Sequence, residues 1–251
     1  MSLGRDIFAS LHEAGTPLLL YNIWDAGSAR AVAEAGAPAL ATGSMSLAGA
    51  QGYPDGELMP LHEMLAAVRR IVAAADLPLS VDFEGGYAAD TGRLADHARS
   101  LAETGAVGCN FEDRIVQGEG LYPVAQQAQR IAAVASSGLF VNARTDLFLD
   151  LLMRGENPDS ADLLPKAVER AAAYAQAGAE CFFVPGLADP ELVARLCEAV
   201  ILPVNIMLRE GMADAATYAQ AGVARISWGP QPWAEAMRQV TAAAALIYRG
   251  Q

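Results

Sequence analysis

Short apolar runs alternate with longer amphipathic segments along the whole chain. The runs are almost continuously apolar, which predicts β-strands that are buried on both faces, as in a parallel sheet. The eight predicted strands cover residues 18–23, 37–42, 78–84, 107–112, 139–144, 180–185, 202–207 and 223–228.

Helical patterns separate these strands, and a further amphipathic helix is predicted at the N-terminus. A recurring phrase marks where several helices end: EAGA at 34–37, ETGA at 103–106, QAGA at 176–179 and QAGV at 220–223. Glycine just past the last helical residue is a stop signal, so each phrase closes a helix and opens a strand. The eight main helices are predicted at 26–35, 61–75, 91–104, 123–136, 164–177, 189–199, 211–221 and 231–249.

Eight strands that alternate with eight helices in 251 residues predict an α/β fold, a (β/α)8 TIM barrel in a single domain spanning 1–251. A doubly wound open sheet is the alternative. It gains no support from glycine fingerprints, because neither GxGxxG after the first strand nor GxxxxGK[ST] occurs. In a barrel, the active site is expected at the C-terminal ends of the strands.

Composition and charge narrow the range of partners. The chain is 53% hydrophobic, with a formal net charge of −12 and a pI near 4.6, so nucleic acid and anionic membranes are not expected partners. No apolar run approaches the roughly 20 residues of a membrane span, and the N-terminus has no signal-peptide core. Cys109, Cys181 and Cys197 fit no zinc motif and are expected to be buried free thiols in a cytoplasmic protein.

The predicted strand ends lack the usual nucleophiles and bases. His12, His62 and His97 fall in predicted helices, where they are expected on the outer ring or the surface. The single lysine, Lys166, follows a proline at a helix start, whereas a Schiff-base lysine belongs on a barrel strand. Carboxylates and arginine are therefore the chemistry that remains.

Four carboxylates are expected at the barrel mouth. Asp82 and Glu84 end the third strand, and because strand side chains alternate, both point to the same side. Glu112 ends the fourth strand, and Asp55 lies in the long loop after the second. Oxygen ligands without histidine or thiolate favour Mg²⁺, with Mn²⁺ as an alternative. Helix capping or pairing with arginine would explain the same acids without a metal.

Anion-binding groups accompany these acids. The loop that begins Thr42-Gly43-Ser44 offers hydroxyl and backbone N–H groups for a carboxylate or phosphoryl group. Arg144 emerges from an apolar strand and requires an anionic partner, either a structural carboxylate or a substrate. Trp24, at the end of the first strand, either lines the pocket or packs in the core.

Six motifs in this order resemble the isocitrate lyase/phosphoenolpyruvate mutase superfamily across nearly the whole chain. They are Thr42-Gly43-Ser44, Tyr53-Pro54-Asp55-Gly56, Val81-Asp82-Phe83-Glu84-Gly85-Gly86-Tyr87, Asn110-Phe111-Glu112-Asp113, Ala143-Arg144-Thr145-Asp146 and Pro203-Val204-Asn205.

The resemblance implies a barrel that binds Mg²⁺ and a small α-oxo acid or its enolate. It implies that Asp82 touches the metal, that Asp55, Glu84 and Glu112 hold it mainly through waters, and that residues 42–44 bind the substrate carboxylate. It further implies that Arg144 neutralises an oxyanion and that Asn205 lies on the pocket wall. A homodimer or homotetramer is implied as well, often with an exchanged C-terminal helix.

One loop departs from the family pattern. Residues 113–122, DRIVQGEGLY, contain none of the lysine, cysteine or histidine that the family's lyases carry there. Glu119 and Tyr122 are the candidate proton-transfer groups in that loop, and Arg144, Asp55 and Glu119 are the candidate catalytic residues. The leading hypothesis is a Mg²⁺-dependent enzyme that cleaves a C–C bond of a small 2-oxo or 2-hydroxy (di)carboxylate through an enolate, yielding an α-oxo acid. The alternatives are P–C bond mutase or hydrolase chemistry on a phosphonopyruvate-like substrate, and a non-catalytic binder of α-oxo acids.

Overall fold

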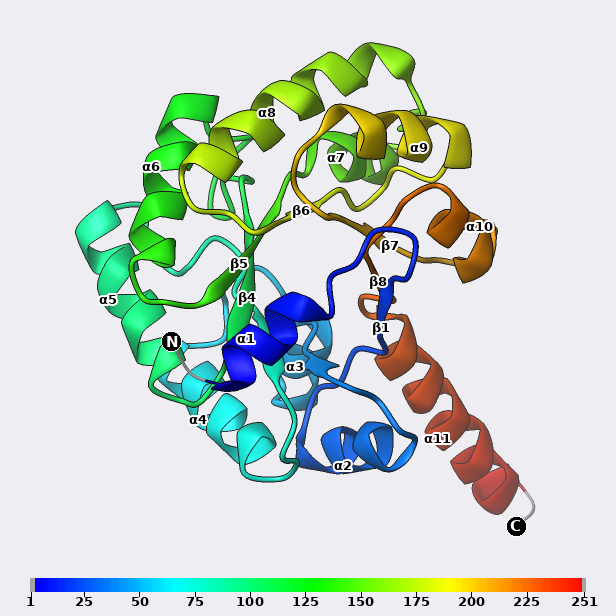
Figure 1. Ribbon diagram of the computed structural model, residues 1–251. Helices are drawn as coiled ribbons and strands as arrows, with labels where there is room; N and C mark the ends of the chain where they lie inside the picture. The colour runs from blue at the N-terminus through cyan, green and yellow to red at the C-terminus, as the bar shows by residue number, and fades with distance from the viewer. Residues whose placement is uncertain (1–2, 250–251) are drawn as a thin grey trace.

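Eight parallel strands form a nearly closed barrel in the computed structural model, which describes residues 3–249 (Figure 1). The strands pair in the order β1-β8-β7-β6-β5-β4-β3-β2. An isolated parallel bridge between Ile23 and Thr42, just beyond the ends of the two edge strands, links the two edges of the sheet. The strands are β1 (Leu18–Leu20), β2 (Leu40–Ala41), β3 (Leu79–Asp82), β4 (Gly108–Glu112), β5 (Phe140–Arg144), β6 (Cys181–Phe183), β7 (Val204–Met207) and β8 (Arg225–Ser227).

Helices surround this barrel, and all eight predicted main helices are present, as is the N-terminal one. Two short helices at the C-terminal ends of strands, α3 and α7, were not predicted. The helices are α1 (Leu3–Ser10), α2 (Ala26–Glu34), α3 (Ser44–Ala50), α4 (Leu61–Val72), α5 (Thr91–Ala102), α6 (Val124–Ala135), α7 (Leu147–Met153), α8 (Leu164–Gln176), α9 (Pro190–Ala199), α10 (Ala215–Gln220) and α11 (Gln231–Arg249), with a 3₁₀ turn at Ala161–Leu163.

The recurring glycine phrase ends its helices as predicted. Gly36, Gly105, Gly178 and Gly222 all have positive φ, between 89° and 99°. A side chain is strained in this left-handed conformation, which glycine adopts freely. Each of the four glycines therefore lets the chain leave a helix and turn toward the next strand.

The two faces of the strands bury different side chains. Residues such as Val81 and Phe111 face outward and pack in the large core between the strands and the helices. The bottom of the barrel interior holds a second, smaller cluster, into which α1 inserts Phe8 against Phe140. His12 follows α1 and stacks on Phe140 with ring centroids 4.5 Å apart. The expectation that His12 lies on the surface is wrong, because α1 closes the bottom of the barrel.

A polar layer lies above this smaller apolar cluster, inside the barrel. Arg225 on β8 donates hydrogen bonds across the interior to Ser80 on β3 and Asn110 on β4. Asn142 on β5 and Asn205 on β7 are fully buried at the same level, since each pairs in register with one of these residues. Apolar strand sequences therefore carry inward-facing polar residues in the middle of the barrel.

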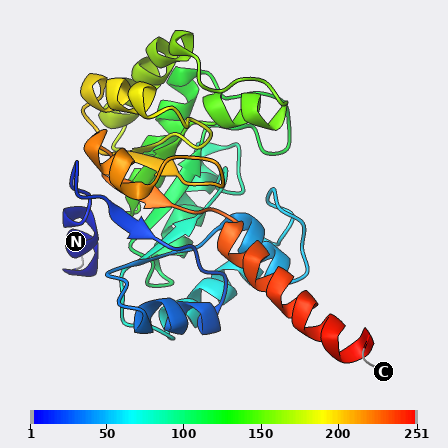
Figure 2. The same ribbon diagram turned by 90° about the vertical axis from the view of Figure 1, so that its right-hand side faces the viewer.

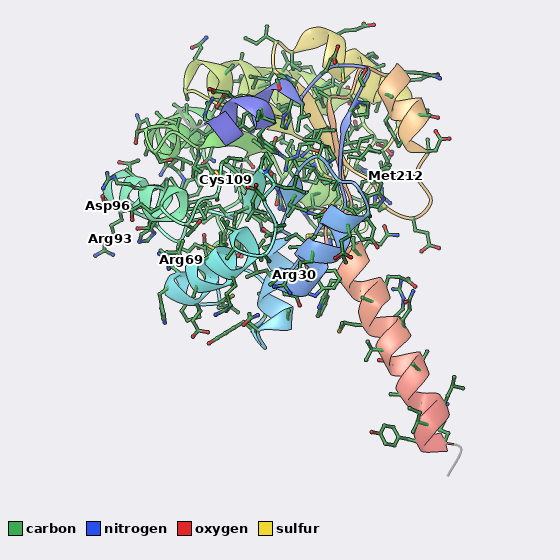
Figure 3. All side chains as sticks on the ribbon, turned by 60° about the horizontal axis from the view of Figure 1, so that its bottom comes forward. Arg30, Arg69, Arg93, Asp96, Cys109 and Met212 are labelled. Atoms are coloured by element: carbon green, nitrogen blue, oxygen red, sulfur yellow. The ribbon has the colours of Figure 1, made fainter. Side chains whose placement is uncertain are left out.

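Two of the three thiols are buried as predicted. Cys109 and Cys181 are buried and Cys197 is partly buried, and all three are free. In Figure 3, Cys109 sits within the packed body, whereas Arg93 and Asp96 on α5 point outward. Within residues 3–249, no helix is both long enough and apolar enough to cross a membrane.

Helix α11 projects away from the barrel (Figures 1 and 2). Pro232 at its start is buried, and the ring of Trp233 packs so closely on α3 that a Cβ on Gly49 would come within 2.9 Å of it. Beyond this base the helix leaves the body and exposes large apolar side chains. These are Val240, Leu246, Ile247 and Tyr248, which are 61–80% exposed.

Candidate active site

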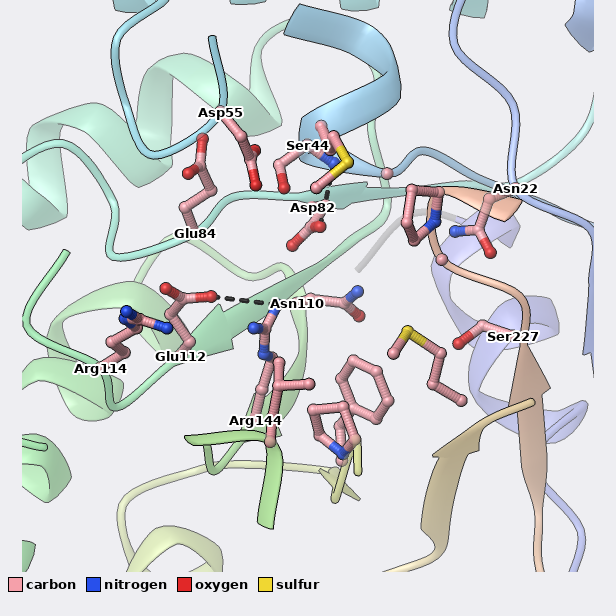
Figure 4. A pocket seen from close by; sticks show the side chains of 18 of the residues that line it. Asn22, Ser44, Asp55, Asp82, Glu84, Asn110, Glu112, Arg114, Arg144 and Ser227 are labelled. Atoms are coloured by element: carbon pink, nitrogen blue, oxygen red, sulfur yellow. Dashed lines mark hydrogen bonds and ion pairs between the residues drawn. The ribbon is translucent and has the colours of Figure 1, made fainter. Parts of the chain in front are cut away.

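A cavity of about 460 Å³ opens at the C-terminal ends of the strands, as expected for a barrel. Figure 4 shows the polar side chains that converge on it from β3, β4, β5 and β8 and the loops that follow the strands. The predicted site residues that line it are Gly43, Ser44, Asp55, Asp82, Glu84, Glu112 and Arg144. The predicted residues that do not line it are Trp24, Thr42, Glu119 and Asn205.

Asp82, the last residue of β3, is fixed at both its backbone and its side chain. Its N–H donates to Thr42 Oγ1 (2.9 Å), and its Oδ2 accepts from the backbone N–H of Ser44 (3.0 Å). Its other oxygen, Oδ1, is buried and has no hydrogen-bond partner within residues 3–249. Thr42 therefore orients Asp82 from below the cavity instead of lining it.

The segment expected to be an open loop after β2 is partly helical. Gly43 is the N-cap of α3, and Ser44 is the first residue of this helix. The free N–H groups of a helix start face anionic groups favourably, and here the first of them binds a carboxylate of the protein itself. The predicted anion-binding segment is thus already engaged with Asp82 through the N–H of Ser44.

Asp82 and Glu84 line the same cavity, but strand alternation does not bring them there. Strand β3 ends at Asp82, and Glu84 has a left-handed backbone with φ of 50°. Glu84 Oε2 accepts from the N–H of Glu57 (2.9 Å). Burial, followed by the charges of Asp82 and Asp55, raises the pKa of Glu84 to about 8. Burial and the charge of Asp82 also raise the pKa of Asp55.

Arg130 on α6 holds the turn that carries Glu84, and sequence reasoning missed it. Its guanidinium donates to the carbonyl oxygens of Gly85 (2.6 Å), Ala88 (2.9 Å) and Ala89 (3.1 Å), and lies 4.2 Å from the ring centroid of Tyr122. An arginine on a helix of the outer ring gives no sequence signal for this role, because the three acceptors that it holds in the turn are backbone carbonyls far away in the sequence.

Glycine is required at the turn after Glu84. A Cβ on Gly86, which has φ of 79°, would lie 2.2 Å from Leu94. A Cβ on Gly85 would lie 2.9 Å from Val116 of the loop at 113–122. The glycine pair therefore lets this turn pack under the loop and against α5.

Arg144 at the end of β5 is held by two carboxylates. Its Nε and Nη2 donate to Asp146 (2.6 and 2.9 Å), and its Nη1 lies 3.1 Å from Glu112 Oε2. Burial lowers the pKa of Arg144, but Asp146 and Glu112 outweigh this and raise it well above its usual range. Burial raises the pKa of Glu112, and Arg144 opposes that shift. Arg144 is thus a rigid, permanently charged cation at the cavity wall.

The loop at 113–122 forms a small hairpin over one side of the cavity. Its first residue, Asp113, is fully buried and accepts from Arg170 (2.9 Å) and the hydroxyl of Tyr174 (2.8 Å). Arg114 and Val116 line the cavity, whereas Glu119 lies exposed at the hairpin tip. The structure therefore does not bring the candidate proton-transfer residue Glu119 to the other site residues.

Trp24 and Asn205 lie outside the cavity lining. Trp24 is partly buried before α2, where its backbone N–H donates to Ser28 Oγ. Asn205 is fully buried in the barrel, and neither atom of its amide has a hydrogen-bond partner within residues 3–249.

The rest of the lining was not predicted. Two asparagines and a serine contribute polar groups from strand positions that read as apolar, namely Asn22, Asn110 and Ser227. An apolar wall consists mainly of Met45, Val116, Leu149, Met153, Phe183 and Met207. Alternation along β4 and β8 would have placed Asn110 and Ser227 inside the barrel, but only the structure brings them to the cavity floor.

The donor set fits a hydrated divalent cation. Four lining carboxylates against two lining guanidiniums, Arg114 and Arg144, leave a formal charge of −2. No three His, Cys, Asp or Glu side chains within residues 3–249 form a ready cluster of direct ligands. Mg²⁺ commonly binds through one or two carboxylates and retains several waters. The unpartnered Oδ1 of Asp82 and the surrounding acids match that pattern.

Comparisons with known proteins identify the family of the chain. A family model described as phosphoenolpyruvate phosphomutase matches residues 8–248. The chain is 32% identical over 250 residues to an uncharacterized protein of Mycobacterium tuberculosis, covering 97% of this chain and 90% of the relative. It is 28% identical over 196 residues to the 2-methylisocitrate lyase of Escherichia coli, covering 77% and 66%.

Among solved structures, the chain resembles a provisionally assigned phosphonomutase from Burkholderia cenocepacia. The two share 44% sequence identity and a TM-score of 0.92, over 97% of this chain and 99% of that one. The named relatives are enzymes and include carbon–carbon lyases. The chain belongs to the phosphoenolpyruvate phosphomutase family, within the PEP mutase/isocitrate lyase superfamily.

Proposed function

We propose that the protein is a Mg²⁺-dependent lyase that cleaves a C–C bond of a small 2-oxo or 2-hydroxy dicarboxylate and yields an α-oxo acid through an enolate. The observation that carries this proposal is the hydrogen bonding of the two carboxylate oxygens of Asp82. One carboxylate oxygen is anchored by Ser44, and the other is buried, unpartnered and surrounded by further lining acids. A buried charged oxygen is costly without a partner, so the site favours a cation.

Asp82 would contact the metal, and Asp55, Glu84 and Glu112 would hold its waters. Mn²⁺ suits the same oxygen donors. When bound, the ion supplies Lewis acidity that polarises a substrate oxygen.

Arg144 would stabilise the negative charge that develops on the substrate. Asp146 and Glu112 hold its guanidinium in place, so little reorganisation is needed when the oxyanion forms. Arg114 lines the cavity from the hairpin, and its guanidinium contacts the sulfur of Met153 (3.5 Å). Two separate cations suit a substrate with two carboxylates. Arg144 would lie at the enolate, and Arg114 would lie at the second carboxylate, at the cavity mouth.

Decarboxylation of a 2-oxo dicarboxylate fits the cavity best among the lyase reactions. A retro-aldol cleavage needs a base to remove a hydroxyl proton, whereas β-decarboxylation moves the C–C bonding pair directly into the enolate as CO₂ leaves. The described lining contains no lysine, cysteine or histidine, its four carboxylates are assigned in this proposal to the metal and its waters, and Glu119 would reach the cavity only after movement of the hairpin. The enolate then takes a proton from water.

P–C bond chemistry is the second candidate. The similarity to the provisionally assigned phosphonomutase at 44% identity over nearly the full length of both chains supports it. A phosphonopyruvate-like substrate has the same 2-oxo carboxylate and would use the same metal and arginine.

We further propose that the protein assembles as a homodimer or homotetramer. Helix α11 leaves the barrel with Val240, Leu246, Ile247 and Tyr248 exposed. Apolar side chains clustered on one projecting helix typically mark a protein interface. A second copy of the chain is the partner that this proposal commits to.

A substrate screen with and without Mg²⁺ tests the reaction. The substrates are oxaloacetate, methylisocitrate, 2,3-dimethylmalate and phosphonopyruvate, read out as pyruvate, oxalate and phosphate. Free Mg²⁺ itself promotes decarboxylation of oxaloacetate, so Asp82→Asn protein at the same Mg²⁺ concentration is the matched background. Pyruvate release from oxaloacetate above that background supports the proposal. Phosphate release from phosphonopyruvate alone would favour the second candidate, and Mg²⁺-dependent binding without any turnover would identify a non-catalytic binder.

A further inference from the structure

Two asparagines line the cavity, and they differ in how their amides are used. Asn22 is fully engaged with the backbone, because its Nδ2 donates to the carbonyl of Thr42 (2.9 Å) and its Oδ1 accepts from Trp228 (2.9 Å). Asn110 is 5% exposed at the cavity floor, and its Nδ2 donates to no protein atom within residues 3–249. Asn22 therefore has a structural role, whereas the amide of Asn110 has a free donor.

The orientation of the Asn110 amide is fixed by chemistry. Arg225 Nη2 lies 3.1 Å from Asn110 Oδ1, and a guanidinium can only donate, so the atom that faces it must be the carbonyl oxygen. Asn142 Nδ2 donates to the same oxygen (2.8 Å). Two donors below the floor hold Oδ1 downward, and the NH₂ group is left to the cavity side.

Arg225 is suited to hold the Asn110 oxygen because its guanidinium can donate hydrogen bonds but cannot accept them. It is completely buried in the barrel, where burial lowers its pKa to about 10, so it remains protonated at neutral pH. It has no carboxylate ion pair within residues 3–249, and Ser80 is its other hydrogen-bond acceptor, at 3.4 Å. A buried arginine without an ion pair is costly to maintain, which points to a function beyond packing.

We propose that Asn110 is a substrate-contacting, specificity-determining residue that donates an N–H to an oxygen of the bound acid, and that Arg225 and Asn142 are positioning residues that keep this donor facing the cavity. Asn110 pairs in register with Asp82, so the donor stands beside the proposed metal ligand. The selected group is a hydrogen-bond acceptor, such as a carboxylate or enolate oxygen, and not an ammonium group, which can only donate. This inference rests on the proposed function, because it assumes a small anionic ligand at the Asp82 site.

Oxalate binding measured by isothermal titration calorimetry in saturating Mg²⁺ tests the donor. Asn110→Ala removes it, and we expect a roughly 10-fold weaker oxalate complex, as for one hydrogen bond to a charged group. Asn110→Asp keeps the shape and gives Arg225 a carboxylate partner, so its melting temperature should not fall although its oxalate affinity does. Ser80→Ala, which removes the other acceptor of the same Arg225 nitrogen, is the matched control and should stay within about twofold of the wild type.

A double-mutant cycle tests the positioning role. Arg225→Met should weaken oxalate binding several-fold, and Arg225→Lys, which retains a donor, should recover part of the loss. In the Asn110→Ala background, Arg225→Met should have no further effect, whereas a merely structural role would weaken binding equally in both backgrounds.

Different results would contradict this inference and the proposed function. Wild-type affinity in Asn110→Ala, or an undiminished Arg225→Met effect in its background, would overturn this inference and leave the proposed function standing. Absence of Mg²⁺-dependent oxalate binding in the wild type would overturn the proposed function itself.

Discussion

The backbone N–H of Ser44 donates a 3.0 Å hydrogen bond to Oδ2 of Asp82. This contact joins the first residue of α3 to the last residue of β3 and selects which carboxylate oxygen is committed to the protein. Oδ1 is left buried and unpartnered. The metal proposal therefore depends on one backbone group as well as on the acids.

Asp82→Asn should weaken Mg²⁺ binding by at least about 100-fold, because the amide keeps the contact with Ser44 but removes the charged ligand. Titration calorimetry with MgCl₂ measures this directly. Asp76→Asn, at an exposed position in the connection between α4 and β3, removes the same charge and serves as the control. Wild-type Mg²⁺ affinity in Asp82→Asn would contradict the metal assignment.

The same substitution should stabilise the metal-free protein. Asp82 raises the pKa of both Asp55 and Glu84, so the acids repel one another in the absence of a cation. We expect Asp82→Asn to increase the free energy of unfolding by about 1 kcal/mol in EDTA, as removal of functional strain often does. Urea denaturation with and without Mg²⁺ separates the effects, and a less stable apo variant would show that the acids are not under electrostatic strain.

Acid should destabilise the fold through His12. Burial and the charge of Arg225 lower the pKa of His12 to about 3, below the roughly 6.5 of an unfolded histidine. The unfolded chain therefore binds the proton more readily, and stability falls as the pH drops from about 6.5 toward 3, by at most ~1.4 kcal/mol per pH unit.

His12→Gln should remove this component of the slope, as measured by urea denaturation at a series of pH values. His62→Gln on the exposed face of α4 is the control. An unchanged slope in His12→Gln would assign the acid sensitivity to other groups.

Arg130→Met should weaken Mg²⁺ binding although Arg130 does not line the cavity. Without its donors to Gly85, Ala88 and Ala89, the turn that carries Glu84 loses its anchor. We expect about a 10-fold loss of Mg²⁺ affinity together with ~3 kcal/mol of stability, since one buried and two partly buried carbonyls lose a charged donor. Arg93→Met on the exposed face of α5 controls for the loss of one positive charge. Unchanged Mg²⁺ affinity in a folded Arg130→Met protein would restrict Arg130 to packing.

Ile247→Glu should shift the protein to a smaller assembly. Ile247 is 64% exposed on α11, and a charge placed in an apolar interface is strongly unfavourable. Light scattering coupled to size-exclusion chromatography measures the mass. Gln239→Glu, on the same helix at a polar position, should leave the mass unchanged, and a monomeric wild type would exclude the proposed assembly.

Periodicity predicted the barrel because burial on both faces leaves a strong signal in parallel strands. The observed strands are shorter than predicted, as for β2, where 37–42 reduces to Leu40–Ala41. Strands tilt in a barrel, so only their central residues pair on both sides. The helix Ser44–Ala50 was missed because it carries few of the usual start and stop signals.

The acids and Arg144 were predictable because charged residues at the ends of apolar strands are conspicuous. The arrangement that gives them their chemistry was not. Glu84 reaches the cavity through a left-handed turn instead of strand alternation, and that turn depends on Arg130 from α6. The partnership of Arg225 with Asn110 joins β8 to β4 across the barrel interior. A single sequence contains no record of such distant side-chain pairs.

The contact between Trp233 and Gly49 connects the projecting helix to the candidate active site. The seven-residue helix α3 has Ser44 at one end, beside Asp82, and Gly49 near the other, beneath the root of α11. We expect that a neighbouring subunit bound to α11 would shift α3 and, with it, the Ser44 N–H that binds Asp82. Under the proposed assembly, the subunits would separate on dilution, and α3 would hold the Asp82 carboxylate less firmly. Specific activity would then depend on the enzyme's own concentration.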